Sequence, residues 1–202
     1  MQLVLATNNQ DKIREIKHLL EDLPVTILTS EDFLDFPDPE ETGRTLEENA
    51  VLKARKISAF CDMPALADDS GLEVDALGGA PGVYSSRYAG ENVTYADNNR
   101  KLINELKGVP PEKRTARFRC VIAIAWDQDD VQTVDGKAEG VITEDIANGK
   151  GFGYDPLFYY PPKNKRFSQM SLAEKNSVSH RGLALQAARA LIVKRLNAPR
   201  EK

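Results

Sequence analysis

Two adjacent carboxylates, Asp68 and Asp69, follow a short apolar run, and the hydroxyl of Ser70 comes directly after them. Like charges a few ångströms apart raise each other's pKa unless a cation lies between them. A bound divalent metal ion would balance both carboxylates. Because glycine allows a turn and apolar–polar alternation resumes over residues 72–75, we expect a strand, an acidic turn at Gly71 and a second strand.

A second polar segment lies near the beginning of the chain, between a predicted buried strand at residues 2–6 and a predicted amphipathic helix. A strand, a polar turn and a helix in this order direct backbone N–H groups at an anion, and the helix dipole assists. Thr7, Asn9 and Lys12 would add side-chain donors. The glycines and the Lys-Ser/Thr pair of a Walker A loop are missing. A plain capped turn remains the alternative, since Asn and Asp often cap helices.

A helix is predicted over residues 46–60, because Thr45 and Glu48 have the spacing of a capping box. Asn49 and Lys53 are four residues apart and therefore share one face of this helix. The pair points either into a cleft or, as charged residues at this spacing usually do, into solvent.

Glycines and aromatic residues alternate in the loop at residues 148–158. Glycine gives the backbone room, and the ring of Phe152 could stack on a flat ligand. The alternative is a surface loop that its aromatic residues anchor to the protein.

The last predicted helix is amphipathic and begins after Ser179, which is a suitable N-cap. His180 and Arg181 would then lie in its first turn, where the helix dipole disfavours cations. Their placement indicates a functional role or a neighbouring acid, although a lone histidine is more often structural than catalytic.

Other segments indicate a mixed α/β fold with a long central sheet. Strands are predicted at residues 25–28 and 116–126, a helix at 95–106, and a bent antiparallel partner of the second strand at 131–143. The length of 202 residues allows one sizeable unit, with room for two lobes around a cleft.

Composition excludes several classes of protein. The net charge of −4, with 29% charged and 41% hydrophobic residues, argues against a protein that coats nucleic acid or binds a membrane surface. No apolar segment reaches membrane-spanning length and the N-terminus turns polar too early for a signal peptide, so we expect a cytoplasmic protein. Cys61 and Cys120 are isolated from each other and from both histidines, which favours reduced, structural thiols.

Together these features describe a site for a nucleoside polyphosphate. The segments supply an anion-binding turn, carboxylate pairs at Glu40/Glu41 and Asp68/Asp69, several lysines and a stacking ring. Carboxylate and phosphate oxygens are ligands that Mg²⁺ prefers, and His- or Cys-based zinc ligation has no candidates.

Eight motifs in this order resemble the inosine triphosphate pyrophosphatase family, also called Ham1-like, and its bacterial dITP/XTP members above all. Each motif alone is weak, but their order and spacing over nearly the whole chain are highly specific. They are Thr7-Asn8-Asn9 with Lys12, Glu40-Glu41-Thr42-Gly43, Glu48-Asn49-Ala50 with Lys53-Ala54, Ala67-Asp68-Asp69-Ser70-Gly71-Leu72, Gly78-Gly79-Ala80-Pro81-Gly82, Phe152-Gly153-Tyr154-Asp155-Pro156, Glu174-Lys175-Asn176 and Ser179-His180-Arg181-Gly182.

The resemblance implies a single two-lobed α/β domain over residues 1–202, with flanking helices around a nucleotide cleft, usually in a homodimer. It implies hydrolysis of inosine, deoxyinosine and xanthosine triphosphates to monophosphate and pyrophosphate, which keeps them out of nucleic acids. The catalytic residues would be Asp69, Asp68, Lys53 and Lys12, and Mg²⁺ would bind Asp69 with Glu41 and Glu40. Substrate would contact Thr7, Asn8, Asn9, Gln10, Asp11, Lys12, Ser70, Phe152, Gly153, Tyr154, Asp155, Lys175, His180 and Arg181.

One residue departs from the family's pattern. Asp11 stands where most members carry glycine, and it adds a carboxylate beside a polyanion. It either caps the helix and faces away, or weakens the binding of triphosphate and makes it more dependent on magnesium.

Two other functions remain as alternatives: a Maf-like nucleotide pyrophosphatase of different specificity, and a nucleotide-binding module without turnover. The motifs around Phe152 and His180 argue against the first, and the paired acids argue against the second, since binding alone does not need them.

Overall fold

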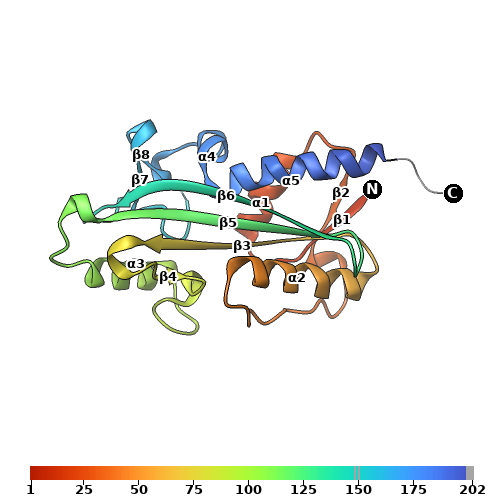
Figure 1. Ribbon diagram of the computed structural model, residues 1–202, viewed down its shortest axis with the longest axis horizontal. Helices are drawn as coiled ribbons and strands as arrows, with labels where there is room; N and C mark the ends of the chain where they lie inside the picture. Colours follow the sequence, from red (N-terminus) through yellow and green to blue (C-terminus); the bar gives the residue numbers. More distant parts are fainter. Residues whose placement is uncertain (148, 150, 199–202) are drawn as a thin grey trace. The chain divides into compact units, whose positions relative to one another are not determined.

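The computed structural model describes residues 1–147, 149 and 151–198 of the chain. Asn148 and Lys150 of the predicted glycine–aromatic loop lie outside the described residues. The fold is mixed α/β, as predicted, and hydrogen bonds connect its strands in the order β2-β1-β3-β5-β6-β7-β8, with β4 paired to β3 (Figure 1). In the part of the chain that the structure describes, no helix is both long and apolar enough to cross a membrane.

Most of the predicted helices and strands agree with the structure in type and extent, whereas the short elements at residues 81–82, 158–160, 165–166 and 172–178 were not predicted. The strands are β1 (Gln2–Leu5), β2 (Thr26–Leu28), β3 (Ala65–Val74), β4 (Pro81–Gly82), β5 (Thr115–Ala125), β6 (Val131–Ile142), β7 (Phe158–Tyr160) and β8 (Lys165–Arg166). The α-helices are α1 (Gln10–Leu20), α2 (Leu46–Cys61), α3 (Tyr95–Glu105), α4 (Leu172–Val178) and α5 (His180–Asn197).

The chain divides into two compact units. The first comprises Met1–Asp69, Cys120–Gly136 and the chain from Arg181 onward, and the second comprises Ser70–Arg119 and Lys137–His180. The boundaries therefore fall within β3, β5 and β6 and at the beginning of α5.

In the first unit, β1 pairs in parallel with both β2 and β3, and its register places Leu5 opposite Leu66. Its core joins these strands to the apolar faces of α1 and α5, represented by Ile16 and Ile192, both fully buried. One side of α5 is buried, with Ala184, Leu185 and Ala188 also in this core, but Leu183 is exposed, so the predicted amphipathic character of this helix is weak.

The second unit has a separate core, in which Phe118, Phe158 and Phe167 contact one another through their rings. Strand β7 pairs antiparallel with both β6 and β8, and β4 pairs antiparallel with β3.

The predicted acidic turn at Gly71 is wrong. Strand β3 continues through residues 65–74 without interruption, so Asp68 and Asp69 lie in the middle of a strand. The turn was expected because Gly71 allows one and the apolar–polar alternation resumes after it. The strand continues instead, and cations from neighbouring helices balance its two buried carboxylates.

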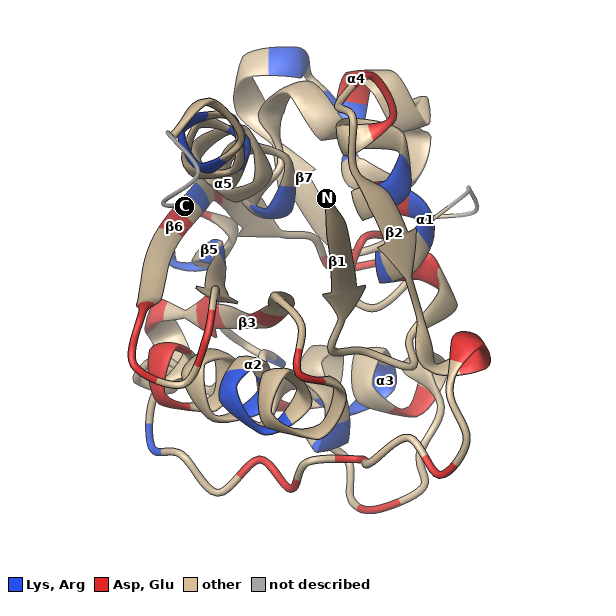
Figure 2. Ribbon diagram, turned by 90° about the vertical axis from the view of Figure 1, so that its right-hand side faces the viewer, with Lys and Arg blue, Asp and Glu red and all other residues tan. Residues whose placement is uncertain are grey.

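The predicted capping box of α2 forms only in half. The hydroxyl of Thr45 accepts a hydrogen bond from the amide of Glu48 at 3.1 Å, as a capping residue should. The carboxylate of Glu48 accepts from the amide of Arg44 at 2.6 Å instead of reaching back to Thr45. Acidic residues recur along the connection that leads from Ser30 to this helix (Figure 2).

Candidate active site

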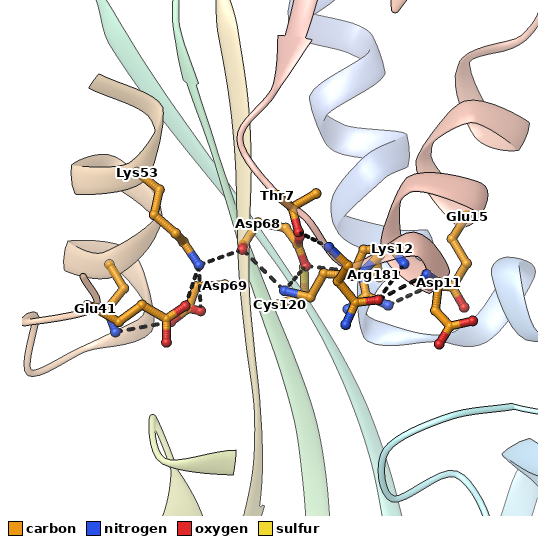
Figure 3. Close-up of polar contacts among 12 residues, drawn as sticks. Thr7, Asp11, Lys12, Glu15, Glu41, Lys53, Asp68, Asp69, Cys120 and Arg181 are labelled. Atoms are coloured by element: carbon orange, nitrogen blue, oxygen red, sulfur yellow. Dashed lines mark hydrogen bonds and ion pairs between the residues drawn. The ribbon is translucent and has the colours of Figure 1, made fainter. Parts of the chain in front are cut away.

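Asp68 and Asp69 are the centre of the site and are almost completely buried, at 1% and 5% exposure. As consecutive residues of strand β3, they point to opposite faces of the sheet. Each therefore meets a different set of partners, all within the first unit (Figure 3).

The carboxylate of Asp68 is held by two cations at one oxygen. Lys12 Nζ lies 3.0 Å and Arg181 Nε 3.1 Å from Asp68 Oδ2, and the thiol of Cys120 lies 4.0 Å from the same atom. Burial alone would raise the pKa of Asp68, but the charges of Lys12, Arg181 and Lys53 outweigh it and hold that pKa well below its ordinary value. Asp68 is therefore ionised at neutral pH.

On the opposite face, Asp69 contacts residues of α2. Lys53 Nζ lies 3.0 Å from Asp69 Oδ1, and Asn49 Nδ2 donates to Asp69 Oδ2 at 3.2 Å. Lys53 Nζ also contacts Glu41 Oε1 at 2.8 Å and the carbonyl of Asp68 at 3.0 Å. Asn49 and Lys53 are buried, so the alternative that they form a solvated helix face is wrong.

The electrostatics of this second group differ from those around Asp68. Burial raises the pKa of Asp69, and although Lys53 lowers it, the nearby charge of Glu41 raises it further. Burial disfavours the charged form of Lys53, but Asp69, Glu41 and Asp68 raise its pKa well above the ordinary value. The pKa values of Asp68 and Asp69 are thus displaced in opposite directions. Such a pair of neighbouring carboxylates is typical of sites of acid–base catalysis.

Asn49 connects the acidic segment before α2 to the strand. Its Oδ1 accepts from the amide of Gly43 at 2.7 Å while its Nδ2 donates to Asp69. A Cβ on Gly43 would lie 2.6 Å from Asn49 Oδ1, so this close approach requires glycine. The amide of Asn49 thereby fixes the backbone beside Glu41.

The N-terminal turn is capped by Asn9. Its Oδ1 accepts from the amides of Asp11 and Lys12 at 3.0 and 3.2 Å, and Thr7 Oγ1 accepts from the amide of Asn9 at 3.2 Å. Asn9 therefore caps α1, and Lys12 extends from the first turn of this helix to Asp68, while anion binding at this turn stays a prediction. Of the other residues in this turn, Thr7 is half-buried and Asn8 and Gln10 are exposed.

Asp11 does not cap the helix, because Asn9 occupies that position. Its carboxylate instead pairs with Arg14 Nη2 at 2.8 Å, an exposed contact one turn along α1. A surface pair of this kind contributes little to stability.

The predicted metal ligands differ in their surroundings. Glu41 and Asp69 both contact Lys53, whereas Glu40 is exposed. Among the described residues, no group of three or more His, Cys, Asp or Glu side chains could hold a metal ion. Two carboxylates nevertheless fit Mg²⁺, which commonly binds one or two protein carboxylates and takes its other ligands from substrate phosphates and water.

The second unit brings together the predicted residues of the glycine–aromatic loop and α4. Lys175 Nζ lies 2.7 Å from Asp155 Oδ2 and 4.5 Å from the centre of the Phe152 ring. Asp155 Oδ2 also accepts from the amide of Phe152 at 3.0 Å. The hydroxyl of Tyr154 donates to the carbonyl of Ser85 at 2.9 Å, so this tyrosine anchors the loop.

Residues of α3 support the same loop. Asn99 Nδ2 donates to the carbonyl of Gly153 at 3.0 Å, and the ring of Tyr95 lies 6.0 Å from that of Phe152. The sequence contains no motif that marks these two residues as neighbours of the loop.

His180 and Ser70 belong to the second unit as well. The ring of His180 stacks on Phe118, with centres 4.5 Å apart and planes at 10°, in accordance with the structural role expected of a lone histidine. Ser70 is half-buried in β3 directly after Asp69.

Sequence reasoning missed Glu15, which is 2% exposed and pairs with Arg181. This contact supplies the neighbouring acid expected for a cation in the first turn of α5. Glu15 lies beside the stripe that contains Ile13 and Ile16 and not on it, so no pattern in the sequence marks this carboxylate as buried.

Comparisons with known proteins identify the family. The model of the Ham1 family matches residues 3–191. The chain belongs to the Ham1 family. The family match removes the Maf-like alternative.

Curated relatives in this family cover almost the whole chain. A dITP/XTP pyrophosphatase of Desulforamulus reducens is 49% identical over 192 residues, covering 95% of this chain and 96% of the relative. One from Geobacter sulfurreducens is 52% identical over 184 residues, covering 91% and 92%. Among solved structures, a Ham1 protein from Coxiella burnetii has 40% sequence identity and a TM-score of 0.88, covering 96% of this chain and 99% of its own.

Proposed function

We propose that this Ham1 family member hydrolyses non-canonical purine nucleoside triphosphates, namely ITP, dITP and XTP, to the monophosphate and pyrophosphate. The observation that carries the proposal is the buried cluster in which Lys12 and Lys53 surround Asp68 and Asp69. A binding module would not need two adjacent buried acids with displaced pKa values.

The two lysines supply the positive charge that phosphoryl transfer requires. Lys12 Nζ and Lys53 Nζ lie 3.4 and 3.0 Å from the carbonyl oxygen of Asp68, so both ammonium groups converge on one point of β3. Cations fixed in this way stabilise the negative charge that develops on phosphate oxygens in the transition state.

The carboxylates divide the remaining tasks. Asp69, whose pKa is raised by burial, is suited to accept a proton from the attacking water, whereas Asp68 stays ionised and orients Lys12. Glu41 and Asp69 would hold Mg²⁺ together with the phosphates. When bound, the ion would neutralise phosphate charge and orient the triphosphate.

Base selection is assigned to the loop that contains Phe152. Its ring can stack on a purine, and Lys175 beside it is a cationic donor. Hypoxanthine and xanthine carry an acceptor carbonyl at C6 where adenine carries a donor amino group, so a cationic donor at that edge favours the first two. The names of the relatives, dITP/XTP pyrophosphatase, support the same substrate class.

Release of pyrophosphate from ITP, dITP, XTP, GTP and ATP, measured with and without Mg²⁺, tests the proposal. We expect turnover that requires the metal and a higher kcat/KM for the first three nucleotides than for ATP. Guanine shares the carbonyl at C6, so a lower kcat/KM for GTP would require discrimination at its 2-amino group. Equal kcat/KM for ATP would contradict the proposed selection, and binding without turnover would identify a nucleotide-binding module instead. The homodimer remains a prediction from the family resemblance, and the cytoplasmic location remains a prediction from the sequence.

A further inference from the structure

The contact between Glu15 and Arg181 lies inside the first unit, with side-chain exposures of 3% and 2%. Glu15 Oε2 accepts from Arg181 Nη1. Burial alone would lower the pKa of Arg181, but Asp68 and Glu15 raise it, so the guanidinium remains charged. Burying the Glu15 carboxylate costs free energy, because the charge loses its contact with water.

Arg181 uses a different edge of its guanidinium for the candidate active site. Its Nε donates to Asp68 Oδ2 at 3.1 Å, and Lys12 Nζ lies 3.0 Å from that same oxygen. The rigid, planar guanidinium couples the orientation of one carboxylate to that of the other. Figure 3 shows Arg181 between Asp68 and the helix that carries Glu15.

Helix α1 contributes at two points to the orientation of Asp68. Lys12 and Glu15 are three residues apart and therefore share a face of this helix. Lys12 contacts the carboxylate of Asp68 directly, and Glu15 contacts it through Arg181. Glu15 balances part of the charge of Arg181, so Asp68 is shared between two cations and is not drawn fully toward one.

We propose that Glu15 is a positioning residue for the hydrolytic centre: through Arg181 it sets the orientation of the Asp68 carboxylate and hence of Lys12. This inference rests on the proposed function. Without the charge of Glu15, Arg181 attracts Asp68 more strongly and Lys12 loses part of its contact with Oδ2. Such a displacement affects the transition state more than the binding of substrate.

The test compares Glu15→Gln with the matched control Glu21→Gln, an acid at the end of the same helix that is largely exposed and pairs only with His18 among the contacts of the described chain. We expect Glu15→Gln to lower kcat for ITP by at least about 10-fold with KM changed by less than about three-fold. The control should keep the kcat of the wild type. A folded Glu15→Gln protein with unchanged kcat would overturn the inference.

A double-mutant cycle on kcat separates positioning through Arg181 from an independent structural effect. If Glu15 acts through Arg181, Glu15→Gln should lower kcat by less than about two-fold in an Arg181→Gln background. Losses that multiply would overturn the inference. Should Glu15→Gln fail to fold, Glu15→Asp replaces it, because this variant keeps the charge but shortens the side chain. We expect its kcat to be lower than that of the wild type. A kcat equal to that of the wild type would count against positioning.

The outcomes also separate the two proposals. A wild-type protein that releases no pyrophosphate from any of the nucleotides would overturn the proposed function and this inference with it. An active wild type with an unaffected Glu15→Gln variant would overturn this inference alone.

Discussion

Asp68 and Asp69 are chemically identical side chains with opposite surroundings. Strand geometry sends one toward Lys12 and Arg181 and the other toward Lys53 and Glu41. The pKa of Asp68 is lowered by cations, whereas burial and a neighbouring acid raise that of Asp69. The difference in pKa between these two adjacent acids therefore follows from the alternation of side chains between the two faces of one strand.

If Asp69 accepts the proton, Asp69→Asn should reduce kcat by at least about 100-fold, because the amide cannot act as a base, while KM changes little. Steady-state kinetics with ITP would measure this. Asp62→Asn provides the control, since Asp62 is an exposed acid in the left-handed conformation that asparagine tolerates. Near-normal turnover in Asp69→Asn would remove Asp69 from the mechanism.

Glu40 and Glu41 are neighbours that the structure distinguishes. Glu41 contacts Lys53 at 2.8 Å and is half-buried, whereas Glu40 is exposed. We expect Glu41→Gln to raise the Mg²⁺ concentration for half-maximal activity by about 10-fold or more, and Glu40→Gln to change it by less than about two-fold. A magnesium titration of the activity of both variants measures this concentration. A larger increase in Glu40→Gln than in Glu41→Gln would identify Glu40 as the metal ligand.

At the scale of elements, periodicity and capping signals predicted α1, α2, α3 and α5 and the long strands to within a few residues. They failed at β3, because a local pattern of charge and glycine looks like a turn when the balancing cations are not visible. Lys12 is 56 residues from Asp68 in sequence and Lys53 is 15 residues from it, each on a different helix, and only tertiary structure brings both to the same strand.

Capping and anion binding can be separated at Asn9. Asn9→Ala should lower the free energy of unfolding by about 1 kcal/mol, because the amides of Asp11 and Lys12 lose their acceptor. Asn9→Asp keeps that acceptor, so we expect stability within about 0.5 kcal/mol of the wild type. If triphosphate binds at this turn, the added charge should raise KM; an unchanged KM in Asn9→Asp would limit Asn9 to capping.

At the scale of the whole molecule, the order of motifs predicted which acids and lysines would meet, and the structure brings together Lys12, Lys53, Glu41, Asp68 and Asp69 as expected. Glu15 was not predicted, because its partner Arg181 is 166 residues away and neither residue alone marks the pairing. The motifs therefore identify the candidate site residues more readily than the buried charges that pair with them.

The buried charges should also govern stability in acid. The pKa of Asp68 is lower in the folded protein than its unfolded value of about 3.9, so its contribution is fully present above that pH and is lost as pH falls toward the folded pKa. Urea denaturation from pH 7 to pH 2.5 should show a lower free energy of unfolding for Asp68→Asn than for the wild type at neutral pH, and this difference should narrow below about pH 4.

The control is Asp22→Asn, which alters an exposed pair with Arg189. It should leave the dependence of the free energy of unfolding on pH in acid nearly unchanged, because solvent screens that pair. A constant difference between Asp68→Asn and the wild type at every pH would show that the pKa of Asp68 is the same in the folded and unfolded states. Narrowing would link the folding of the first unit to the ionisation of the carboxylate that Lys12 and Arg181 hold.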